Sequence, residues 1–313
     1  MKALIHESAE HADWFVVNWC LGNTCNFSCS YCPKVLHDGS NPWPDLETLK
    51  TFIDRIIEQK AGKRVAFEFT GGEVTVYKDF VELCAHIKSR GAAVALISNG
   101  SRTVRWWERF ADKADHVCLS FHAEEGDPDL FTNIVSIASR NIKTHVNVMM
   151  HPDHWDKCIS VAEQVVSIPN ITMALQPLIV DFGEELFHYE PEQQAVFENQ
   201  YELYQKRIVK TVSNGFSLRG IMREIEPGRL GTIWQPHILI AEKKNNWEGW
   251  SCSAGVEQII IDMDGTIWRG WCRQGGRIGH IKDPGFQLPA DWVDCGKSFC
   301  HCNFDIMCTK VMK

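Results

Sequence analysis

Residues 24–33 read T-C-N-F-S-C-S-Y-C-P and place Cys25, Cys29 and Cys32 in C-x3-C-x2-C spacing. Thiolates this close in sequence can hold three corners of a cubic iron–sulfur cluster, which requires four ligands. The fourth iron then has no cysteine and keeps an open coordination position. Because an open iron is a place for chemistry, this stretch predicts a reactive site and not only a store of electrons.

The segments around this loop alternate between strand-like and helix-like patterns. Residues 14–21 (W-F-V-V-N-W-C-L) are apolar, β-branched and aromatic, and predict a buried strand that ends at the cysteine loop. Five more strands are expected over 65–70, 93–98, 116–122, 144–150 and 172–177, with helices between them. Alternation about every 12 to 15 residues predicts a parallel α/β sheet with crossover helices.

Small and polar residues gather where these strands end. In parallel α/β folds the chemistry lies at the C-terminal ends of the strands. The cysteine loop follows the first expected strand, and later strand ends carry Gly71, Gly72, Glu73, Ser98, Asn99, Ser120, His122, Asn147 and Gln176. We expect these strand ends to line one cavity.

Composition narrows the class of protein. The net charge is −8 and no basic block occurs, which argues against a nucleic-acid partner. No window of about 18 apolar residues occurs, so neither a transmembrane helix nor a membrane partner is expected. The N-terminus has no signal-peptide pattern, and the expected location is therefore cytoplasmic.

The 13 cysteines concentrate in two parts of the chain. Three lie in the loop described above, and six lie between residues 252 and 308. Metal sites require such clustering, whereas secreted disulfide scaffolds are shorter and richer in loops. The other four are interpreted as small buried apolar side chains: Cys20, Cys84, Cys118 and Cys158.

Three regions are expected along the chain. An α/β domain spans residues 10–180, a helical connector spans 181–249, and a cysteine-rich domain spans 250–313. Within the connector, an acidic loop over 181–191 precedes one long amphipathic helix over 191–212, and the pattern over 215–249 is irregular.

The cysteine loop resembles that of the radical S-adenosylmethionine (radical SAM) superfamily, whose signature has an aromatic residue before the third cysteine, here Tyr31. The resemblance implies a partial (β/α)6 barrel, a [4Fe–4S] cluster on Cys25, Cys29 and Cys32, and S-adenosylmethionine on the open iron. It also implies an external one-electron reductant such as flavodoxin or ferredoxin. The alternative for the loop is a zinc site or a disulfide pair.

The later strand ends extend this resemblance through residues 14–180. The superfamily carries a Gly-Gly-Glu motif after its second strand, as here at 71–73. Two glycines let backbone approach a ligand closely, and a carboxylate or carbonyl there can accept from an ammonium group. The implied cofactor contacts are Tyr31, Gly71, Gly72, Glu73, Ser98, Asn99, Ser120, His122, Asn147 and Gln176.

The tail resembles the auxiliary-cluster extensions of many radical enzymes, called SPASM or, when shortened, twitch domains. The resemblance implies one auxiliary [4Fe–4S] cluster, held by Cys252, Cys272, Cys300 and one of Cys302, Cys308 or Cys295. The spacing departs from the usual pattern, because six residues separate Gly265 from Cys272. A structural zinc knuckle is the alternative.

The expected function is a radical enzyme that oxidises or epimerises a small molecule, such as a carbohydrate-like compound. An auxiliary cluster can accept an electron from a substrate radical, which gives dehydrogenation. A hydrogen atom donated by a surplus tail thiol (Cys295, Cys302 or Cys308) would give epimerisation. The first expected strand begins near residue 14, which disfavours an N-terminal peptide-recognition domain. A peptide- or protein-modifying radical enzyme and a non-enzymatic metal-binding module are the alternatives.

Overall fold

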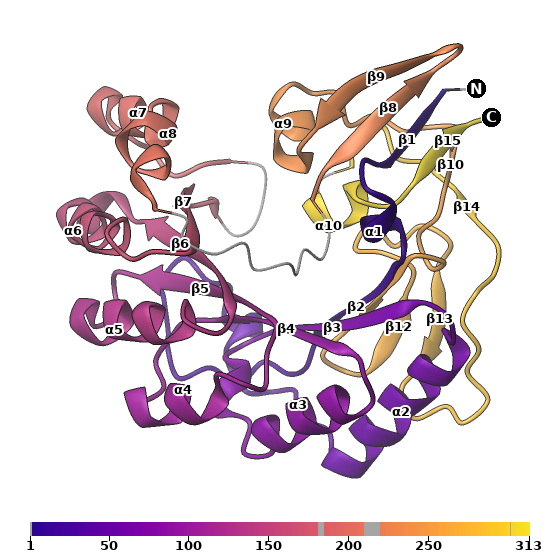
Figure 1. Cartoon of the computed structure of the whole chain (residues 1–313), viewed down its shortest axis with the longest axis horizontal. Coiled ribbons are helices and arrows are strands. Elements are labelled where there is room, and N and C mark those ends of the chain that lie inside the picture. Colours follow the sequence, from indigo (N-terminus) through magenta and orange to yellow (C-terminus); the bar gives the residue numbers. More distant parts are fainter. Residues whose placement is uncertain (1, 181–184, 210–219, 301) are drawn as a thin grey trace.

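The computed structural model describes residues 2–180, 185–209, 220–300 and 302–313. These residues build a nine-stranded sheet and a six-stranded sheet. In Figure 1 the helices of the first half of the chain follow the outer side of the larger sheet, and both termini lie at the smaller sheet. No helix in the described ranges is long and apolar enough to cross a membrane.

The larger sheet contains the six expected strands, parallel and in chain order. They are β2 (Trp14–Cys20), β3 (Arg64–Thr70), β4 (Ala93–Ser98), β5 (His116–His122), β6 (Lys143–Met150) and β7 (Ile171–Pro177). The crossover helices are α2 (Leu46–Gln59), α3 (Phe80–Ser89), α4 (Val104–Phe110), α5 (Pro128–Ala138) and α6 (Trp155–Val165), with short 3-10 turns η1 (Lys34–Leu36), η2 (Val74–Val76) and η3 (Pro152–His154). The prediction of a partial α/β barrel is confirmed.

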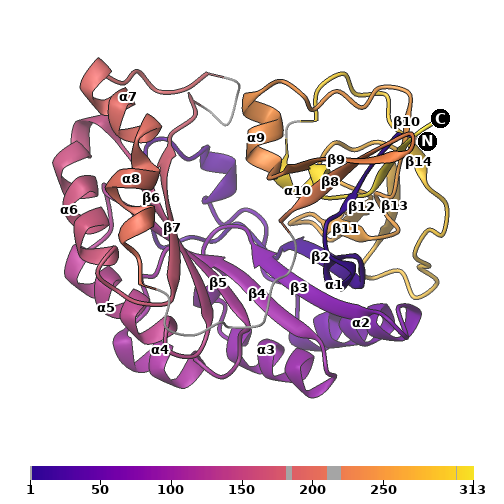
Figure 2. The same cartoon turned by 45° about the horizontal axis from the view of Figure 1, so that its top comes forward.

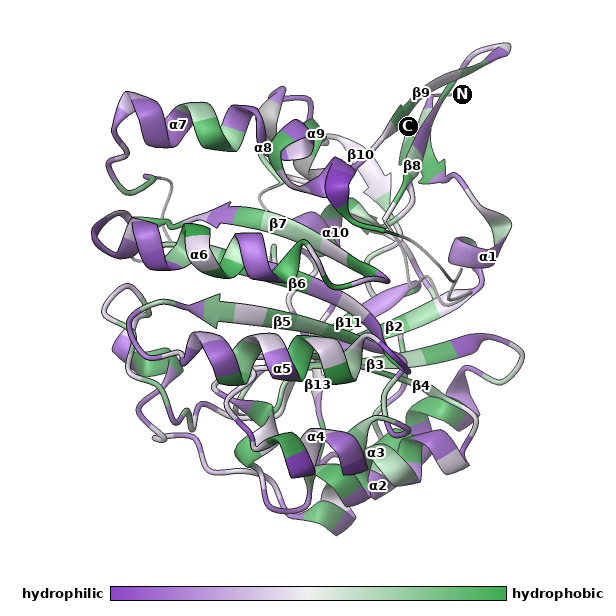
Figure 3. Cartoon of the chain, turned by 60° about the vertical axis from the view of Figure 1, so that its left-hand side comes forward, coloured by the Kyte–Doolittle hydropathy of each residue, from purple (hydrophilic) through white to green (hydrophobic). Residues whose placement is uncertain are grey.

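Local chemistry explains where these helices begin and which face they bury. The side chains of Asp45, Thr103 and Asp127 accept hydrogen bonds from backbone N–H groups in the first turns of α2, α4 and α5. Figure 3 shows hydrophilic and hydrophobic bands alternating along α5 and α6, as in helices that turn one apolar stripe to a sheet. In α2 that stripe includes the fully buried Phe52 and Ile53.

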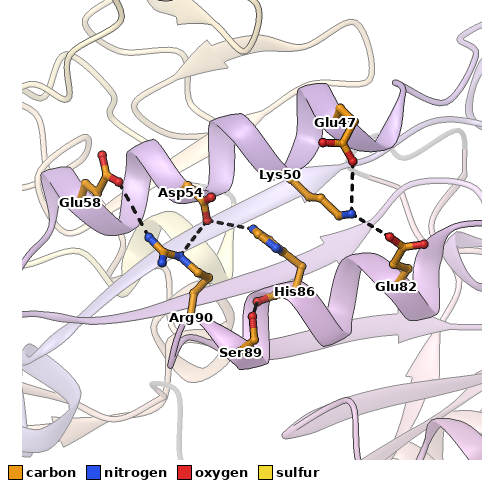
Figure 4. Close-up of polar contacts among 8 residues, drawn as sticks. All are labelled: Glu47, Lys50, Asp54, Glu58, Glu82, His86, Ser89 and Arg90. Carbon is orange, nitrogen blue, oxygen red and sulfur yellow. Dashed lines mark hydrogen bonds and ion pairs between the residues drawn. The ribbon is translucent and has the colours of Figure 1, made fainter.

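Polar contacts join the outer surfaces of α2 and α3 (Figure 4). One oxygen of Asp54 contacts His86 Nε2 at 2.8 Å and Arg90 Nε at 3.0 Å. Lys50 lies between Glu47 and Glu82, at 3.2 and 2.7 Å. These side chains are half-exposed or exposed, so they orient the two helices but add little to the free energy of unfolding.

The smaller sheet combines both ends of the described chain. Its order is β14 (Val293–Asp294), β10 (Trp250–Cys252), β15 (Lys310–Met312), β1 (Ala3–His6), β8 (Met222–Glu226) and β9 (Arg229–Trp234). Three short helices accompany it: α1 (Ala9–Ala12), α9 (Pro236–Ala241) and α10 (Asn303–Ile306). Strand β1 lies between β8 and β15, so the N-terminal segment completes a sheet made from the last third of the chain.

The tail also extends the barrel sheet. Strand β11 (Gln258–Ile261) pairs in parallel with β2, and β12 (Thr266–Trp268) and β13 (Arg277–His280) follow antiparallel. Figure 2 shows these strands beside β2, at the opposite end of the sheet from β7. The ends of β2 and β11 therefore reach the same edge of the sheet. The predicted boundary near residue 250 remains a proposal, because each sheet draws strands from both sides of it.

The connector differs from its sequence prediction. In place of one helix over 191–212, the chain forms α7 (Pro191–Glu198), α8 (Gln200–Leu203) and η5 (Gln205–Arg207), because Asn199 and Tyr204 leave the helical conformation. Residues 210–212 of that prediction, the stretch 181–184 of the acidic loop and the stretch 215–219 lie outside the described residues. The region expected to be irregular contains the hairpin β8–β9, whose turn carries Gly228 at φ +81°.

Candidate active site

A cavity of about 580 Å³ lies at the C-terminal ends of the barrel strands. Cys25, Cys29 and Cys32 line this cavity. All nine residues that the sequence places at later strand ends line it too: Gly71, Gly72, Glu73, Ser98, Asn99, Ser120, His122, Asn147 and Gln176. The parallel sheet thus gathers into one place residues that are far apart in the chain.

The cysteine loop is closed by a buried asparagine that the sequence did not single out. The Nδ2 group of Asn23 lies 2.8 Å from the Val35 carbonyl oxygen, 2.8 Å from Asp38 Oδ1 and 3.0 Å from Ser40 Oγ. Its Oδ1 accepts from the backbone N–H of Asn41 at 2.8 Å. Asn23 is fully buried, so it ties the entry of the loop to its exit.

Two glutamates that follow β5 hold the same loop from the side. The backbone N–H and the hydroxyl of Ser30 donate to the Glu124 carboxylate at 2.6 and 2.5 Å. The hydroxyl of Ser28 donates to Glu125 at 2.9 Å. Burial would raise the pKa of Glu124, but the bonds from Ser30 hold it below its ordinary value. The end of β5 therefore sets the position of the cysteines.

Tyr31 orients a histidine and does not line the cavity. Its hydroxyl lies 2.6 Å from Nδ1 of His122, and the two rings stack with an interplanar angle of 12°. Burial lowers the pKa of His122 to about 4, so its imidazole is neutral near pH 7. The sequence predicts a direct cofactor contact for Tyr31, which stays a prediction; in the structure its hydroxyl bonds His122.

The two glycines of the 71–73 turn make room for protein backbone. A Cβ on Gly71 would lie 2.2 Å from the carbonyl oxygen of Gly22, and a Cβ on Gly72 would lie 2.2 Å from that of Thr24. The N–H groups of Gly72 and Glu73 donate to these carbonyls at 2.9 Å. We expected the glycines to let a ligand approach. Their missing side chains also make room for the backbone that leads into the cysteine loop, and the ligand contact stays a prediction.

Glu73 is a structural anchor at the same turn. It is 1% exposed, and its carboxylate accepts from Thr75 N–H, Thr75 Oγ1, Ser98 Oγ and Asn99 N–H at 2.5 to 3.0 Å. Burial raises the pKa of Glu73, and these hydrogen bonds oppose that rise. Four protein donors occupy this carboxylate, and its expected contact with a ligand ammonium group stays a prediction. It joins the ends of β3 and β4.

The three loop thiols are neighbours in a partly buried setting. Burial raises the pKa values of Cys25, Cys29 and Cys32, that of Cys29 to about 12, and the other two sulfurs add to the rise at Cys29. The thiolate is the form that binds metal, so metal binding at this loop must displace protons.

One wall of the cavity comes from residues that sequence reasoning missed. Cys20 lines it, although it was interpreted as an ordinary buried side chain, and so do Asp262, Met263, Trp271 and Arg273 from the tail. Arg273 Nη1 lies 2.8 Å from Asp262 Oδ2, and Arg273 has a positive φ of 59°. The strand pattern of β11 was visible in the sequence, but its parallel pairing with β2 was not.

Asp305 of α10 organises the tail cysteines. It is 3% exposed, and its carboxylate accepts from the backbone N–H groups of Trp271 at 3.0 Å and Cys272 at 2.7 Å. A Cβ on Gly270 would lie 2.7 Å from the same carboxylate, so only glycine fits there. The Nε2 group of Gln258 completes the set at 3.2 Å. One buried carboxylate thus fixes the turn that presents Cys272.

The six tail cysteines fall into separate surroundings. Cys252 and Cys308 pack together, and a hydrogen bond from the Cys308 thiol lowers the pKa of Cys252 to about 6. Cys252 also interacts electrostatically with Cys272, Cys295 and Cys300. Cys302 instead packs beneath the barrel with Trp14, Val16, Ala66 and Phe304.

No tail cysteine in the described ranges lines the cavity. Cys295 and Cys308 are buried, at 8% and 0% exposure, and Cys302 packs below the barrel. A thiol that donates a hydrogen atom must contact the substrate. The positions of Cys295, Cys302 and Cys308 therefore do not suit the donor role expected for one of them, whereas Cys20 lies on the cavity wall.

The donor chemistry of both regions fits iron–sulfur clusters. Three thiols from one loop at the edge of a cavity suit a cluster with one open iron. In the part of the chain that the structure describes, no three His, Cys, Asp or Glu side chains converge as they would around a single ion.

Comparisons with known proteins agree with this geometry. Residues 19–163 match the sequence profile of the Radical SAM superfamily, and no curated protein matches the chain. The structure of native anSMEcpe with bound AdoMet is similar, with 14% identity, a TM-score of 0.50, and coverage of 86% of this chain and 78% of that one. The structure of Streptococcus suis SuiB bound to S-adenosylmethionine is also similar, with 11% identity and a TM-score of 0.52. The match covers 87% of this chain and 64% of that one. The likeness to these structures shows the fold, and together with the profile match and the cysteine loop it leads to one conclusion: residues 19–163 of the chain form a domain like those of the Radical SAM superfamily.

Proposed function

We propose that this radical SAM enzyme abstracts a hydrogen atom from a small molecule and thereby oxidises or epimerises it. The observation that carries the proposal is the single cavity shared by the three loop cysteines, the 71–73 turn and the other strand ends. When bound there, a [4Fe–4S] cluster and S-adenosylmethionine supply the 5′-deoxyadenosyl radical that makes the abstraction. An external reductant such as flavodoxin or ferredoxin supplies the electron.

The chain's own residues divide the work at this end of the cavity. Cys25, Cys29 and Cys32 would hold the cluster, and Asn23 and the Glu124–Ser30 contact keep their loop in place. Among the expected contacts, Asn147 already bonds His145 and Cys118. His122 uses Nδ1 for Tyr31, which leaves Nε2 for a bound molecule.

The opposite wall is where we place the substrate. It carries the Asp262–Arg273 ion pair, the Trp271 ring and the Cys20 thiol. Because the cavity of about 580 Å³ must also take S-adenosylmethionine, the space that remains suits a small ring or a single side chain. A guanidinium, a carboxylate and a flat aromatic face suit a polar ring such as a carbohydrate.

We propose a second [4Fe–4S] cluster on Cys252, Cys272, Cys300 and Cys308. Cys308 is assigned as the fourth ligand because it packs against Cys252. A cluster in this position gives the protein a second redox centre on the side of the cavity that Trp271 and Arg273 close. Dehydrogenation requires such an electron acceptor, and epimerisation requires a hydrogen donor, for which Cys20 is the candidate.

The test is anaerobic reconstitution with iron and sulfide, followed by reduction with dithionite. The expected result is about eight irons per chain and formation of 5′-deoxyadenosine from S-adenosylmethionine. The variant with Cys25, Cys29 and Cys32 all changed to Ala should keep roughly half the iron and form no 5′-deoxyadenosine. Cluster-loaded protein that forms none contradicts the proposal and leaves the metal-binding module.

Substrate class is tested by isotope transfer. Deuterated sugars and aminocyclitols are incubated with the loaded enzyme, and mass spectrometry follows deuterium into 5′-deoxyadenosine. Transfer from a small molecule supports the proposal. Transfer only from a peptide that co-purifies with the enzyme would assign it instead to peptide modification.

A further inference from the structure

Lys310 is a buried cation inside the cysteine-rich region. It is 1% exposed, and its Nζ donates to the carbonyl oxygens of Asp305 at 2.8 Å, Ile306 at 3.0 Å and Cys308 at 2.9 Å. Three acceptors require three N–H donors. Only the protonated ammonium has three, because a neutral amine has two. The hydrogen-bond geometry therefore fixes the positive charge.

The Asp305 carboxylate interacts with this charge electrostatically but forms no ion pair with it. The nearby carboxylate of Asp305 accepts from Gln258, Trp271 and Cys272 instead. In the described ranges no ion pair joins Lys310 to an acidic side chain, and the Trp247 ring, 5.6 Å from Nζ, adds only a cation–π contact. Burying an ion without a direct ion pair is costly, so a further negative charge bound beside Lys310 is favourable.

The sulfurs of the proposed second cluster are in position to supply that charge. Cys252 and Lys310 are directly opposite each other on the antiparallel strands β10 and β15. Residues opposite each other in this way point to the same side of a sheet. Cys308 bonds Lys310 through its carbonyl and packs against Cys252. The Lys310 ammonium group thus lies beside Cys252 and Cys308, two of the four proposed cluster ligands.

We propose that Lys310 is a positioning residue whose fixed positive charge raises the reduction potential of the second cluster. The inference rests on the second cluster proposed above. Four thiolates make that cluster an anion, and reduction adds one more negative charge. A cation held in a medium of low dielectric constant stabilises the reduced form more than the oxidised form.

The experiment measures the midpoint potential of the second cluster alone. The parent protein carries Cys25→Ala, Cys29→Ala and Cys32→Ala, so that only tail iron remains after anaerobic reconstitution. Lys310→Gln keeps N–H donors without the charge, and Lys310→Met removes both. Lys282→Gln changes an exposed lysine of the same region and is the matched control. Each protein is titrated with dithionite and followed by electron paramagnetic resonance.

The expected result is a more negative midpoint potential in both Lys310 variants and no shift in the control. Unchanged midpoint potentials in both variants overturn the role of Lys310. A shift in Lys310→Met alone assigns the effect to hydrogen bonding and overturns the role of the charge. If neither neutral variant retains iron, Lys310→Arg decides: retention supports the need for charge and loss overturns it. A parent that binds no tail iron overturns the second cluster itself, whereas 5′-deoxyadenosine formation by the unmodified protein is a separate result.

Discussion

At the scale of single residues, the site depends on a glycine that has no Cβ atom. Gly72 has space for no side chain, because the Thr24 carbonyl oxygen lies where a Cβ would be. The backbone of the 71–73 turn and the backbone entering the cysteine loop are therefore in direct contact. Any atom added between them must push the cysteines away from the strand ends.

We predict that Gly72→Ala separates the cysteine loop from the barrel. Forcing a Cβ against backbone should lower the free energy of unfolding by about 1–3 kcal/mol. The more specific effect is loss of the iron bound by Cys25, Cys29 and Cys32, measured as iron per chain after reconstitution. Gly285→Ala is the control, since Gly285 has no positive φ and an added Cβ would make only an ordinary contact, 3.5 Å from Asp283 Oδ1. Equal iron in both variants would contradict the prediction.

Residue types in the site were readable from the sequence, but their roles were less so. The cysteine loop and the strand ends stand out because each follows a strand with its own apolar pattern. The roles of Glu73 and Tyr31 cannot be read from the sequence, because their partners Ser98 and His122 lie on other strands. Cys20 could not be told from an ordinary buried cysteine until β11 brought Asp262 beside it.

At the scale of elements, strand β1 is held to the tail by a partly buried glutamate. Glu257 accepts from the backbone N–H of Thr309 at 2.9 Å and lies 3.2 Å from His6 Nε2. Burial alone would raise the pKa of Glu257, but the bonds from His6 and Thr309 lower it to about 2. The Glu257 carboxylate therefore joins β1, through His6, to Thr309, the residue directly before β15.

We predict that this contact contributes to acid sensitivity. The pKa of Glu257 is lower in the folded protein, about 2, than the ordinary value of 4.5. Its contribution is complete above pH 4.5 and is lost as the pH falls toward 2, by roughly 3 kcal/mol in total. Urea unfolding between pH 2 and pH 6 measures it. Glu257→Gln should flatten the decline, and the exposed Glu198→Gln should not; parallel curves for all three proteins would contradict the prediction.

The strands that sequence reasoning missed, β1, β8 and β9, lack a long buried apolar run. Strand β1 has four residues and gains its partners from β8 and β15, far along the chain. The hairpin β8–β9 exposes Leu230 and Ile233, so it lacks the alternation of a half-buried strand pair. By contrast, β4 and β5 have the predicted bounds, because their apolar runs are buried within the sheet.

At the scale of the whole molecule, the two sheets share strands across the chain. Strand β11 covers the edge of β2, and its three isoleucines, Ile259, Ile260 and Ile261, are fully buried. Burying each such side chain contributes about 1.5–3 kcal/mol. Strand β1 in turn depends on β15. The barrel and the tail are therefore expected to unfold together.

We predict that a protein truncated after residue 249 does not fold independently. It loses the strand that covers β2 and a partner of β1, so it should lack a cooperative thermal transition and be cut rapidly by protease. The full chain should show one transition by circular dichroism. The variant with Ile233→Ser, an exposed position on β9, controls for lost apolar surface. A cooperative transition in the truncated protein would show that the barrel is autonomous.

The pairing of β11 with β2 also determines when the edge of β2 becomes covered during translation. The ribosome makes β2 and the cysteine loop early, and it makes residues 258–261 only after the six barrel strands are complete. Until then the nascent chain has an uncovered apolar strand edge, which invites pairing with other chains. The same late segment carries Asp262 to the cavity wall. Translation of the tail thus closes the aggregation-prone edge and the reaction chamber in a single event, so an unfinished chain has the cysteines of the radical centre but no enclosed space in which to use them.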